Sequence, residues 1–155
     1  MLNLIQAYEN YLVKVKQASA NTVSSYLRDI RQFTAWLQIR GESDLLQVHQ
    51  DTISDYLAHL QAEGRSGATA SRTLASLKNF YAYLQSNGFM DVSPISGEIR
   101  VERGEKKLPQ ILTGKEVELL LSQPACVDAK GYRDKAMLEL MYATGIRVTE
   151  LIELD

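Results

Sequence analysis

Apolar residues recur at spacings of three and four through most of the chain, which is the pattern of helices that bury one face. Within the first ninety residues this pattern predicts four helices, and no alternating strand pattern of useful length competes with it. The connections between the four stripes are short, so the sequence predicts a compact four-helix bundle. The predicted inner stripes are Leu4, Ile5, Tyr8, Tyr11, Leu12 and Val15; Val23, Tyr26, Leu27, Ile30, Phe33 and Leu37; Ile53, Tyr56, Leu57 and Leu60; and Ala70, Leu74, Leu77, Phe80, Tyr81 and Leu84.

Residues that are typical of helix starts and ends support the bounds of these four helices. Ser19 and Asn21 are candidate caps for the second helix, and Ser66 is the candidate cap for the fourth. Gly64 stops the third helix, and the fourth is expected to close near residues 87–88, an Asn-Gly pair. The first domain is therefore placed at residues 1–92.

The composition changes between residues 93 and 109. This segment, SPISGEIRVERGEKKLP, has two prolines, two glycines and seven charged residues, and it has no helical stripe. Such a composition is typical of an exposed linker between domains. The chain is therefore divided into a helical domain at 1–92, a linker at 93–109 and a second domain at 110–155.

The second domain opens on a strong helix start. Thr113 and Glu116 are spaced as a capping box, and Leu112 and Val117 as a hydrophobic staple. Further helices are expected over about residues 132–142 and from about Arg147, separated by a break at Gly145. About 45 residues rarely bury enough apolar area to be stable alone, so this segment is expected to be the opening piece of a larger, mainly α-helical domain.

Composition excludes several kinds of site. Cys126 is the single cysteine of the 155 residues, which rules out an intrachain disulfide and a cysteine-based metal site and fits a reducing compartment. The two histidines, His49 and His59, lack the spacing of a helical metal pair. The N-terminus does not resemble a signal peptide, and no segment is long and apolar enough to span a membrane. We therefore expect a cytoplasmic protein without a metal.

The total charge of −2 argues mildly against nucleic-acid binding, but the charge distribution outweighs it. Residues 64–90 contain no Asp or Glu, although Arg65, Arg72 and Lys78 lie there. The predicted third helix has the opposite character, since it carries several acids. The outer faces of the second and fourth helices are predicted to carry Asn21, Ser24, Ser25, Arg28, Arg31 and Gln32, with Asp29 at the flank, and Ser71, Arg72, Ala75, Ser76 and Lys78.

Two basic faces of this kind suit the major groove of DNA. Arginine and lysine neutralise phosphates, and Ser, Thr and Asn bond to phosphates or base edges, whereas acids would repel the backbone. The alternative is a solvated surface that happens to lack acids. Two such faces in one bundle leave both interpretations open at this point.

Arg147 stands between Ile146 and Val148, directly after Thr144-Gly145. A guanidinium beside the free N–H groups of a helix start is well placed to hold a phosphate, because its planar fork can grip two non-bridging oxygens. The alternative is an ordinary solvent-exposed arginine in a first helical turn.

The segment RDKAMLELMYATGIRVTELIELD, residues 133–155, resembles the first conserved box of the tyrosine recombinases, the phage-integrase and Xer-type site-specific recombinases. The segment KLPQILTGKEVELLL resembles the opening of that family's catalytic domain. NTVSSYLRDIRQFTAWL and SRTLASLKNFYAYLQSNG resemble the second and fourth helices of its N-terminal, SAM-like core-binding domain. The resemblance covers essentially the whole chain and is nearest in style to the bacterial Xer-like members.

The resemblance implies that the second and fourth helices of the bundle enter the major groove while a second domain clamps the DNA from the opposite side. It implies that Arg147 is the first catalytic arginine, which activates the scissile phosphate, and that Glu150 occupies a buried acidic position that supports the box. The implied DNA-facing residues are Thr22, Ser24, Ser25 and Arg28 on one helix and Thr69, Ser71 and Arg72 on the other, with Lys78 a weaker phosphate contact.

In the family, strands are cut and rejoined through a 3′-phosphotyrosyl intermediate by four protomers on two DNA sites, with no nucleotide cofactor, metal or small-molecule substrate. The family's remaining catalytic groups lie downstream: a lysine on a β-hairpin, a His-x-x-Arg box, a His or Trp, and the tyrosine nucleophile. We therefore expect this chain to be an N-terminal fragment that binds DNA and is inactive alone. The alternatives are a non-catalytic DNA-binding regulator of recombination sites and a helical adaptor between proteins.

Overall fold

The computed structural model describes residues 2–42, 44–95, 99, 101 and 110–154. These residues are helical and irregular, with no strand among them, as the sequence predicts. The chain divides into two compact units, residues 1–106 and 107–155. Most of the proposed linker, namely residues 96–98, 100 and 102–109, lies outside the described residues.

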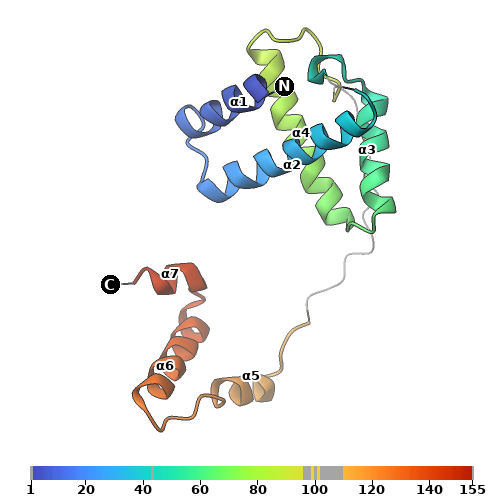
Figure 1. Cartoon of the computed structure of the whole chain (residues 1–155). Helices are drawn as coiled ribbons and strands as arrows, with labels where there is room; N and C mark the ends of the chain where they lie inside the picture. The colour runs from blue at the N-terminus through green and yellow to red at the C-terminus, as the bar shows by residue number, and fades with distance from the viewer. Residues whose placement is uncertain (1, 43, 96–98, 100, 102–109, 155) are drawn as a thin grey trace. The chain divides into compact units, whose positions relative to one another are not determined.

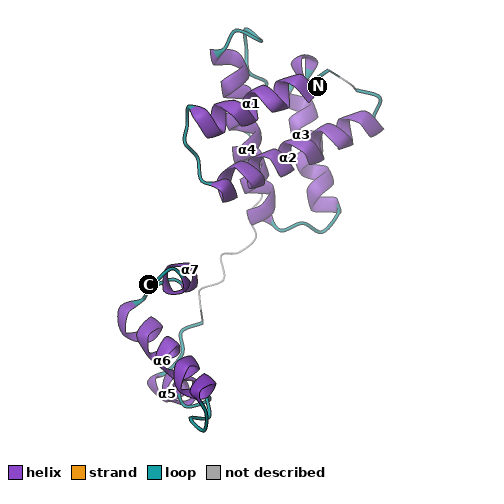
Figure 2. Ribbon diagram, turned by 60° about the vertical axis from the view of Figure 1, so that its left-hand side comes forward, coloured by secondary structure: helices purple, strands orange, loops and turns teal. Residues whose placement is uncertain are grey.

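Four α-helices and one short 3-10 helix build the first unit. They are α1 (Leu2–Lys14), α2 (Ala20–Ile39), η1 (Leu45–Gln47), α3 (Gln50–Ala62) and α4 (Gly67–Ser86). Two of them, α2 and α4, are long and cross each other, and both views show the other helices packed around this crossing (Figures 1 and 2). The crossing buries Phe33 of α2 and Leu77 and Phe80 of α4 completely. All four predicted helices of the bundle are confirmed.

Local hydrogen bonds explain where the two long helices begin. The Ser19 hydroxyl accepts a hydrogen bond from the Thr22 amide at 3.3 Å, and the Ser66 hydroxyl accepts one from the Thr69 amide at 3.2 Å. Each bond satisfies an amide that has no partner in the first turn of a helix. Ser19 is thus the cap of α2, and the other candidate, Asn21, lies inside the helix.

The 3-10 helix η1 was not predicted from the sequence. Its cap is Asp44, whose carboxylate accepts a hydrogen bond from the Leu46 amide at 2.9 Å. Leu45 and Val48 are buried in the core, and the Leu45 carbonyl accepts a hydrogen bond from the Tyr81 hydroxyl at 3.2 Å. A segment this short has no apolar periodicity, so its place depends on the core that it closes.

The second unit contains α5 (Gly114–Leu121), α6 (Ala129–Thr144) and α7 (Val148–Ile152). The predicted capping box of α5 is confirmed: Glu116 accepts from the Thr113 amide at 2.7 Å, and the Glu116 amide donates to the Thr113 hydroxyl at 3.4 Å. Helix α6 begins earlier than expected because the Asp128 carboxylate accepts a hydrogen bond from the Gly131 amide at 2.7 Å. Gly145 ends α6 with a positive φ of 68°, which a residue without a Cβ adopts at little cost.

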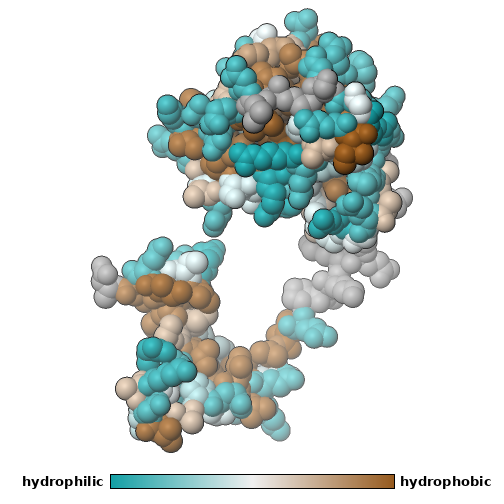
Figure 3. Space-filling view, viewed as in Figure 1, coloured by the Kyte–Doolittle hydropathy of each residue, from teal (hydrophilic) through white to brown (hydrophobic). Residues whose placement is uncertain are grey.

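Large apolar side chains of the second unit lie at its surface (Figure 3). Among its described residues only Leu151 is buried. Tyr132 and Tyr142 of α6 are 63% and 66% exposed. Three short helices have too little facing surface to cover these side chains, as expected for a segment of this length.

Candidate nucleic-acid interface

The sequence-predicted contacts of the first unit lie on α2 and α4, the pair of helices that cross at the centre of the bundle. Ser24 and Arg28 of α2 are exposed, as is Lys78 of α4. The others are exposed or half-buried: Thr22 and Ser25 on α2, and Thr69, Ser71 and Arg72 on α4. The predicted residues therefore reach the surface on the two helices that pack most closely together.

The two threonines of this set also serve the helix caps. The Thr22 and Ser19 hydroxyl oxygens lie 2.9 Å apart, and those of Thr69 and Ser66 lie 3.0 Å apart. A hydroxyl can donate one bond while accepting others, so these groups keep acceptor capacity toward solvent. Their positions at the first turns of α2 and α4 are thus fixed by the caps.

The basic side chains of α2 and α4 differ in their surroundings. Arg31 of α2 lies 4.0 Å from Glu9 of α1, and its side chain is 63% exposed, so this contact is a weak surface ion pair. Arg28 and Lys78 are exposed. Arg72 is different, because one nitrogen of its guanidinium, Nη1, pairs with a carboxylate inside the bundle.

The partner of Arg72 is Asp29, whose side chain is fully buried. The same carboxylate oxygen, Oδ2, accepts a hydrogen bond from the Ser76 hydroxyl at 2.7 Å. The expectation that Asp29 lies at the flank of an exposed face and that Ser76 lies opposite the apolar stripe is therefore wrong, since both are 0% exposed. Together the three side chains tie α2 to α4 at their crossing.

The sequence held a signal for this buried acid. Asp29 lies three residues after Tyr26 and four before Phe33, which places it beside the apolar stripe of its helix. Asp29 also affects Tyr56 of α3. Burial is the main reason that the pKa of Tyr56 is raised to about 12, and the negative charge of Asp29 is the second reason. Tyr56 is therefore a neutral phenol at physiological pH.

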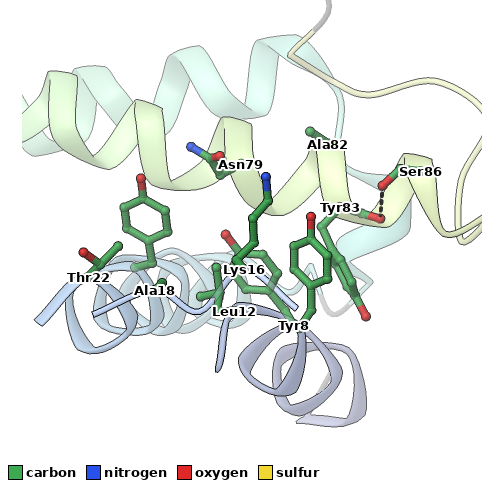
Figure 4. Close-up of a pocket in the computed structure, with 11 residues that line it drawn as sticks. Tyr8, Leu12, Lys16, Ala18, Thr22, Asn79, Ala82, Tyr83 and Ser86 are labelled. Carbon is green, nitrogen blue, oxygen red and sulfur yellow. Dashed lines mark hydrogen bonds between the residues drawn. The ribbon is translucent and has the colours of Figure 1, made fainter. Parts of the chain in front are cut away.

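A half-open cavity of about 440 Å³ lies between α1, α2 and α4 (Figure 4). Its wall includes the rings of Tyr8, Tyr26 and Tyr83, and the predicted contact Thr22 lies at its edge. Burial raises the pKa of Tyr8, whose hydroxyl is buried without a hydrogen-bond partner among the described residues. Lys16 also lines this cavity and was not selected from the sequence, because it falls just beyond the first helical stripe.

Arg147 lies in the second unit, where it precedes α7 as its cap residue. Its amide donates to Glu150 at 2.9 Å, and its Nη1 donates to the other oxygen of the same carboxylate, also at 2.9 Å. The side chains of Arg147 and Glu150 are 80% and 49% exposed. Glu150 is thus not buried here as the resemblance implied, because no other element of this unit covers it. It holds Arg147 at the helix start, with most of the guanidinium facing solvent.

The described residues contain neither a metal site nor a membrane-spanning helix. No group of three or more His, Cys, Asp or Glu residues in the described ranges could hold a metal ion. Within the same ranges, no helix has the length and apolar character needed to cross a membrane.

Comparison with known proteins identifies the family. The model for the phage integrase N-terminal SAM-like domain matches residues 5–88, more than half of the chain. The chain belongs to the phage integrase family, the tyrosine recombinases. A second model, for the phage integrase family, matches residues 110–155. Helices α1 to α4 therefore form the SAM-like domain of a tyrosine recombinase, which confirms the resemblance read from the sequence.

Curated relatives agree with this assignment. A Caldanaerobacter subterraneus protein classed with the tyrosine recombinases is 40% identical over 98% of this chain and 52% of its own length. The tyrosine recombinase XerD of Listeria monocytogenes is 36% identical over 99% of this chain and 52% of its own length. The XerD of Staphylococcus epidermidis is 34% identical, and the match covers all of this chain and 52% of the relative. The chain thus spans about half the length of the curated relatives that it matches.

Proposed function

We propose that this chain is the DNA-binding half of a site-specific recombinase and that it binds duplex DNA through the surface of α2 and α4. The observation that carries the proposal is the placement of charge on this surface. Arg28 and Lys78 are exposed, while Asp29, the only acid in the sequences of α2 and α4, is buried in the core. A surface of this kind attracts phosphates without the repulsion that an exposed carboxylate would add.

The remaining residues of this surface suit the positioning of a helix on the duplex. Ser24, Ser25 and Ser71 are small and offer hydroxyls, which bond to phosphate oxygens or base edges and allow the helices to approach closely. Thr22 and Thr69 lie at the first turns of α2 and α4, where free amides favour a phosphate. In this proposal Arg28 and Lys78 supply sequence-independent attraction.

Arg147 is proposed to hold the scissile phosphate. Its side chain is 80% exposed and its guanidinium is already oriented by Glu150, so it can exchange this carboxylate for the non-bridging oxygens of a phosphate. In the intact family this residue acts with groups further along the chain to form a 3′-phosphotyrosyl intermediate. We propose the same reaction for the complete recombinase, with four protomers on two DNA sites, in the cytoplasm and without a cofactor.

The DNA-binding proposal can be tested with fluorescence anisotropy on a labelled mixed-sequence duplex at several salt concentrations. The wild-type chain should bind with about micromolar affinity, since one half of a clamp makes mainly phosphate contacts. The slope of log K against log salt is negative, and Arg28→Ala and Lys78→Ala should each reduce its magnitude by about 0.9. Arg40→Ala is the matched control, because Arg40 pairs with Glu42 and Asp55 and lies over the Trp36 ring, away from this surface.

Wild-type binding that is absent, or a salt slope that neither substitution changes, would overturn the proposal. Loss of slope in Arg40→Ala alone would move the interface to another face of the bundle. The fold of each variant is checked by circular dichroism so that a loss of binding is not confused with unfolding.

A further inference from the structure

Arg72 is a predicted DNA contact that is held from inside the bundle. Its Nη1 pairs with Oδ2 of Asp29, which is 0% exposed, and that oxygen also accepts from Ser76 at 2.7 Å. The Ser76 hydroxyl lies 3.2 Å from the Arg72 carbonyl as well, so the same small network spans one turn of α4. The guanidinium is therefore tethered at one corner, while 41% of the side chain is exposed.

The buried acid lowers the value of Arg72 as a phosphate contact. The pair has no net charge, and affinity for the phosphate backbone comes from positive charge that displaces counterions. A residue selected only to neutralise a phosphate would gain nothing from a carboxylate against its guanidinium. Arg28 and Lys78, which are exposed, are better suited to that role.

The same acid raises the value of Arg72 as a reader of bases. A guanidinium carries five N–H donors in a rigid plane, and the tether to Asp29 involves one nitrogen. The major-groove edge of guanine presents two neutral acceptors, O6 and N7, that a planar fork can bind together only when its orientation is right. Arg72 lies in the second turn of α4, and residues near the N-terminal end of a recognition helix are those that reach base edges.

We infer, on the basis of the proposed DNA-binding function, that Arg72 reads a guanine in the major groove and that Asp29 is the residue that positions it. Asp29 restricts the orientation of the guanidinium before DNA arrives, which reduces the conformational freedom lost on binding. The role of Arg72 then lies in choosing a sequence, and the general attraction to DNA comes from other cations.

The test is an in vitro selection of binding sites from a duplex library with a randomised segment, run with the full chain. The wild type should enrich a motif that contains at least one strongly preferred guanine. Arg72→Ala, Arg72→Lys and Asp29→Asn should each reduce the preference for that guanine by about tenfold and leave the other positions of the motif intact. Arg72→Lys is informative because it keeps the charge and removes the planar fork.

Two control variants separate this role from others. Ser76→Ala removes one hydrogen bond of the network but leaves the pair of Asp29 and Arg72, so its motif should match the wild type. Arg28→Ala should weaken binding to all duplexes and lower the salt slope, with the motif unchanged. If Asp29→Asn does not fold, as judged by circular dichroism, the two Arg72 variants still carry the test.

Several results would overturn the inference. One is an Arg72→Ala variant that keeps the wild-type motif and lowers the salt slope by about one, which would make Arg72 a phosphate contact. Another is an Arg72→Lys variant with an unchanged motif, because charge alone would then suffice. A wild-type chain that binds duplexes but enriches no guanine would also refute it, while leaving the proposed function in place. A wild-type chain that binds no duplex would refute both.

Discussion

Asp29 and Arg72 lie 43 residues apart in the chain and meet where α2 and α4 cross, with the carboxylate inside the bundle and the guanidinium partly outside it. The carboxylate has a second oxygen, Oδ1, that is buried without a hydrogen-bond partner among the described residues. A buried charge is costly unless it is paired, so most of the compensation for Asp29 comes from Arg72 and Ser76.

Removing Arg72 should therefore destabilise the first unit. We expect Arg72→Ala to lower the free energy of unfolding by about 2 kcal/mol, less than for a fully buried pair because Arg72 is partly exposed. Ser76→Ala should cost about 1 kcal/mol, since it removes one hydrogen bond to the same oxygen. Urea denaturation followed by circular dichroism measures both. The matched control is Arg28→Ala, an exposed arginine of α2, which should change stability by less than about 0.5 kcal/mol.

The double variant Asp29→Asn with Arg72→Ala should lose less stability than the sum of the two single variants, because Asp29→Asn removes the acid that Arg72→Ala leaves unpaired. Strict additivity would mean that the two side chains do not stabilise each other.

Two buried tyrosines should respond in opposite ways to removal of their hydroxyls. The Tyr81 hydroxyl donates to the Leu45 carbonyl at 3.2 Å, so Tyr81→Phe leaves that carbonyl unpaired and should cost about 1 kcal/mol. The buried Tyr8 hydroxyl has no partner among the described residues, so Tyr8→Phe should be neutral or slightly stabilising. Thermal unfolding of the two variants side by side provides the comparison. A larger loss for Tyr8→Phe than for Tyr81→Phe would show that the Tyr8 hydroxyl is bonded in solution.

The cap of α5 should weaken in acid. Hydrogen bonds from the amide and the hydroxyl of Thr113 lower the pKa of Glu116 below its usual 4.5. Because the capped form binds the proton less tightly than the uncapped form, the cap contributes fully above about pH 4.5 and is lost as the pH falls through the lowered pKa. The Thr113 amide resonance in a ¹⁵N NMR titration should report this loss. Glu116→Gln should remove the transition, and Glu118→Gln, which changes an acid of the same helix outside the box, should keep it.

In the chain of residues 1–155, Arg147 should bind a phosphate, but this chain should not cut DNA. Displacement at phosphorus needs a nucleophile, a proton donor for the leaving oxygen and more than one positive group, of which Arg147 supplies one. A suicide-substrate assay should therefore detect no covalent adduct with this chain. In a longer chain that carries the family's downstream groups, Arg147→Ala should abolish cleavage and leave binding largely intact.

Glu150→Gln is the companion variant for that assay, because it loosens the Arg147 fork without removing it. It should reduce cleavage less than Arg147→Ala. A covalent adduct formed by residues 1–155 would refute the prediction that this chain does not cut DNA. Full cleavage by the longer Arg147→Ala chain would refute the catalytic role of Arg147.

The sequence by itself determined the helices and most of their ends. Apolar spacing predicted the four helices of the bundle. Ser19, Ser66 and Thr113 could be predicted as caps because a cap is a contact between residues two or three apart. The family's box around Arg147 could also be recognised, because its pattern is contiguous in the sequence. Interactions of this range depend on local order, which the sequence displays directly.

Only the tertiary structure decided the environments of Asp29, Arg72 and Ser76. A helical wheel places a side chain on a face of its own helix, but burial depends on which other helix crosses that face and at which turn. The crossing of α2 and α4 covers Asp29 and Ser76. Asp29, which the sequence places near the surface, is therefore buried and pairs with Arg72. The exposure of Glu150 and Tyr132 has the converse cause, because no neighbouring element of the second unit lies over them. Burial is a property of the contact between elements, so it is fixed only when the elements have packed.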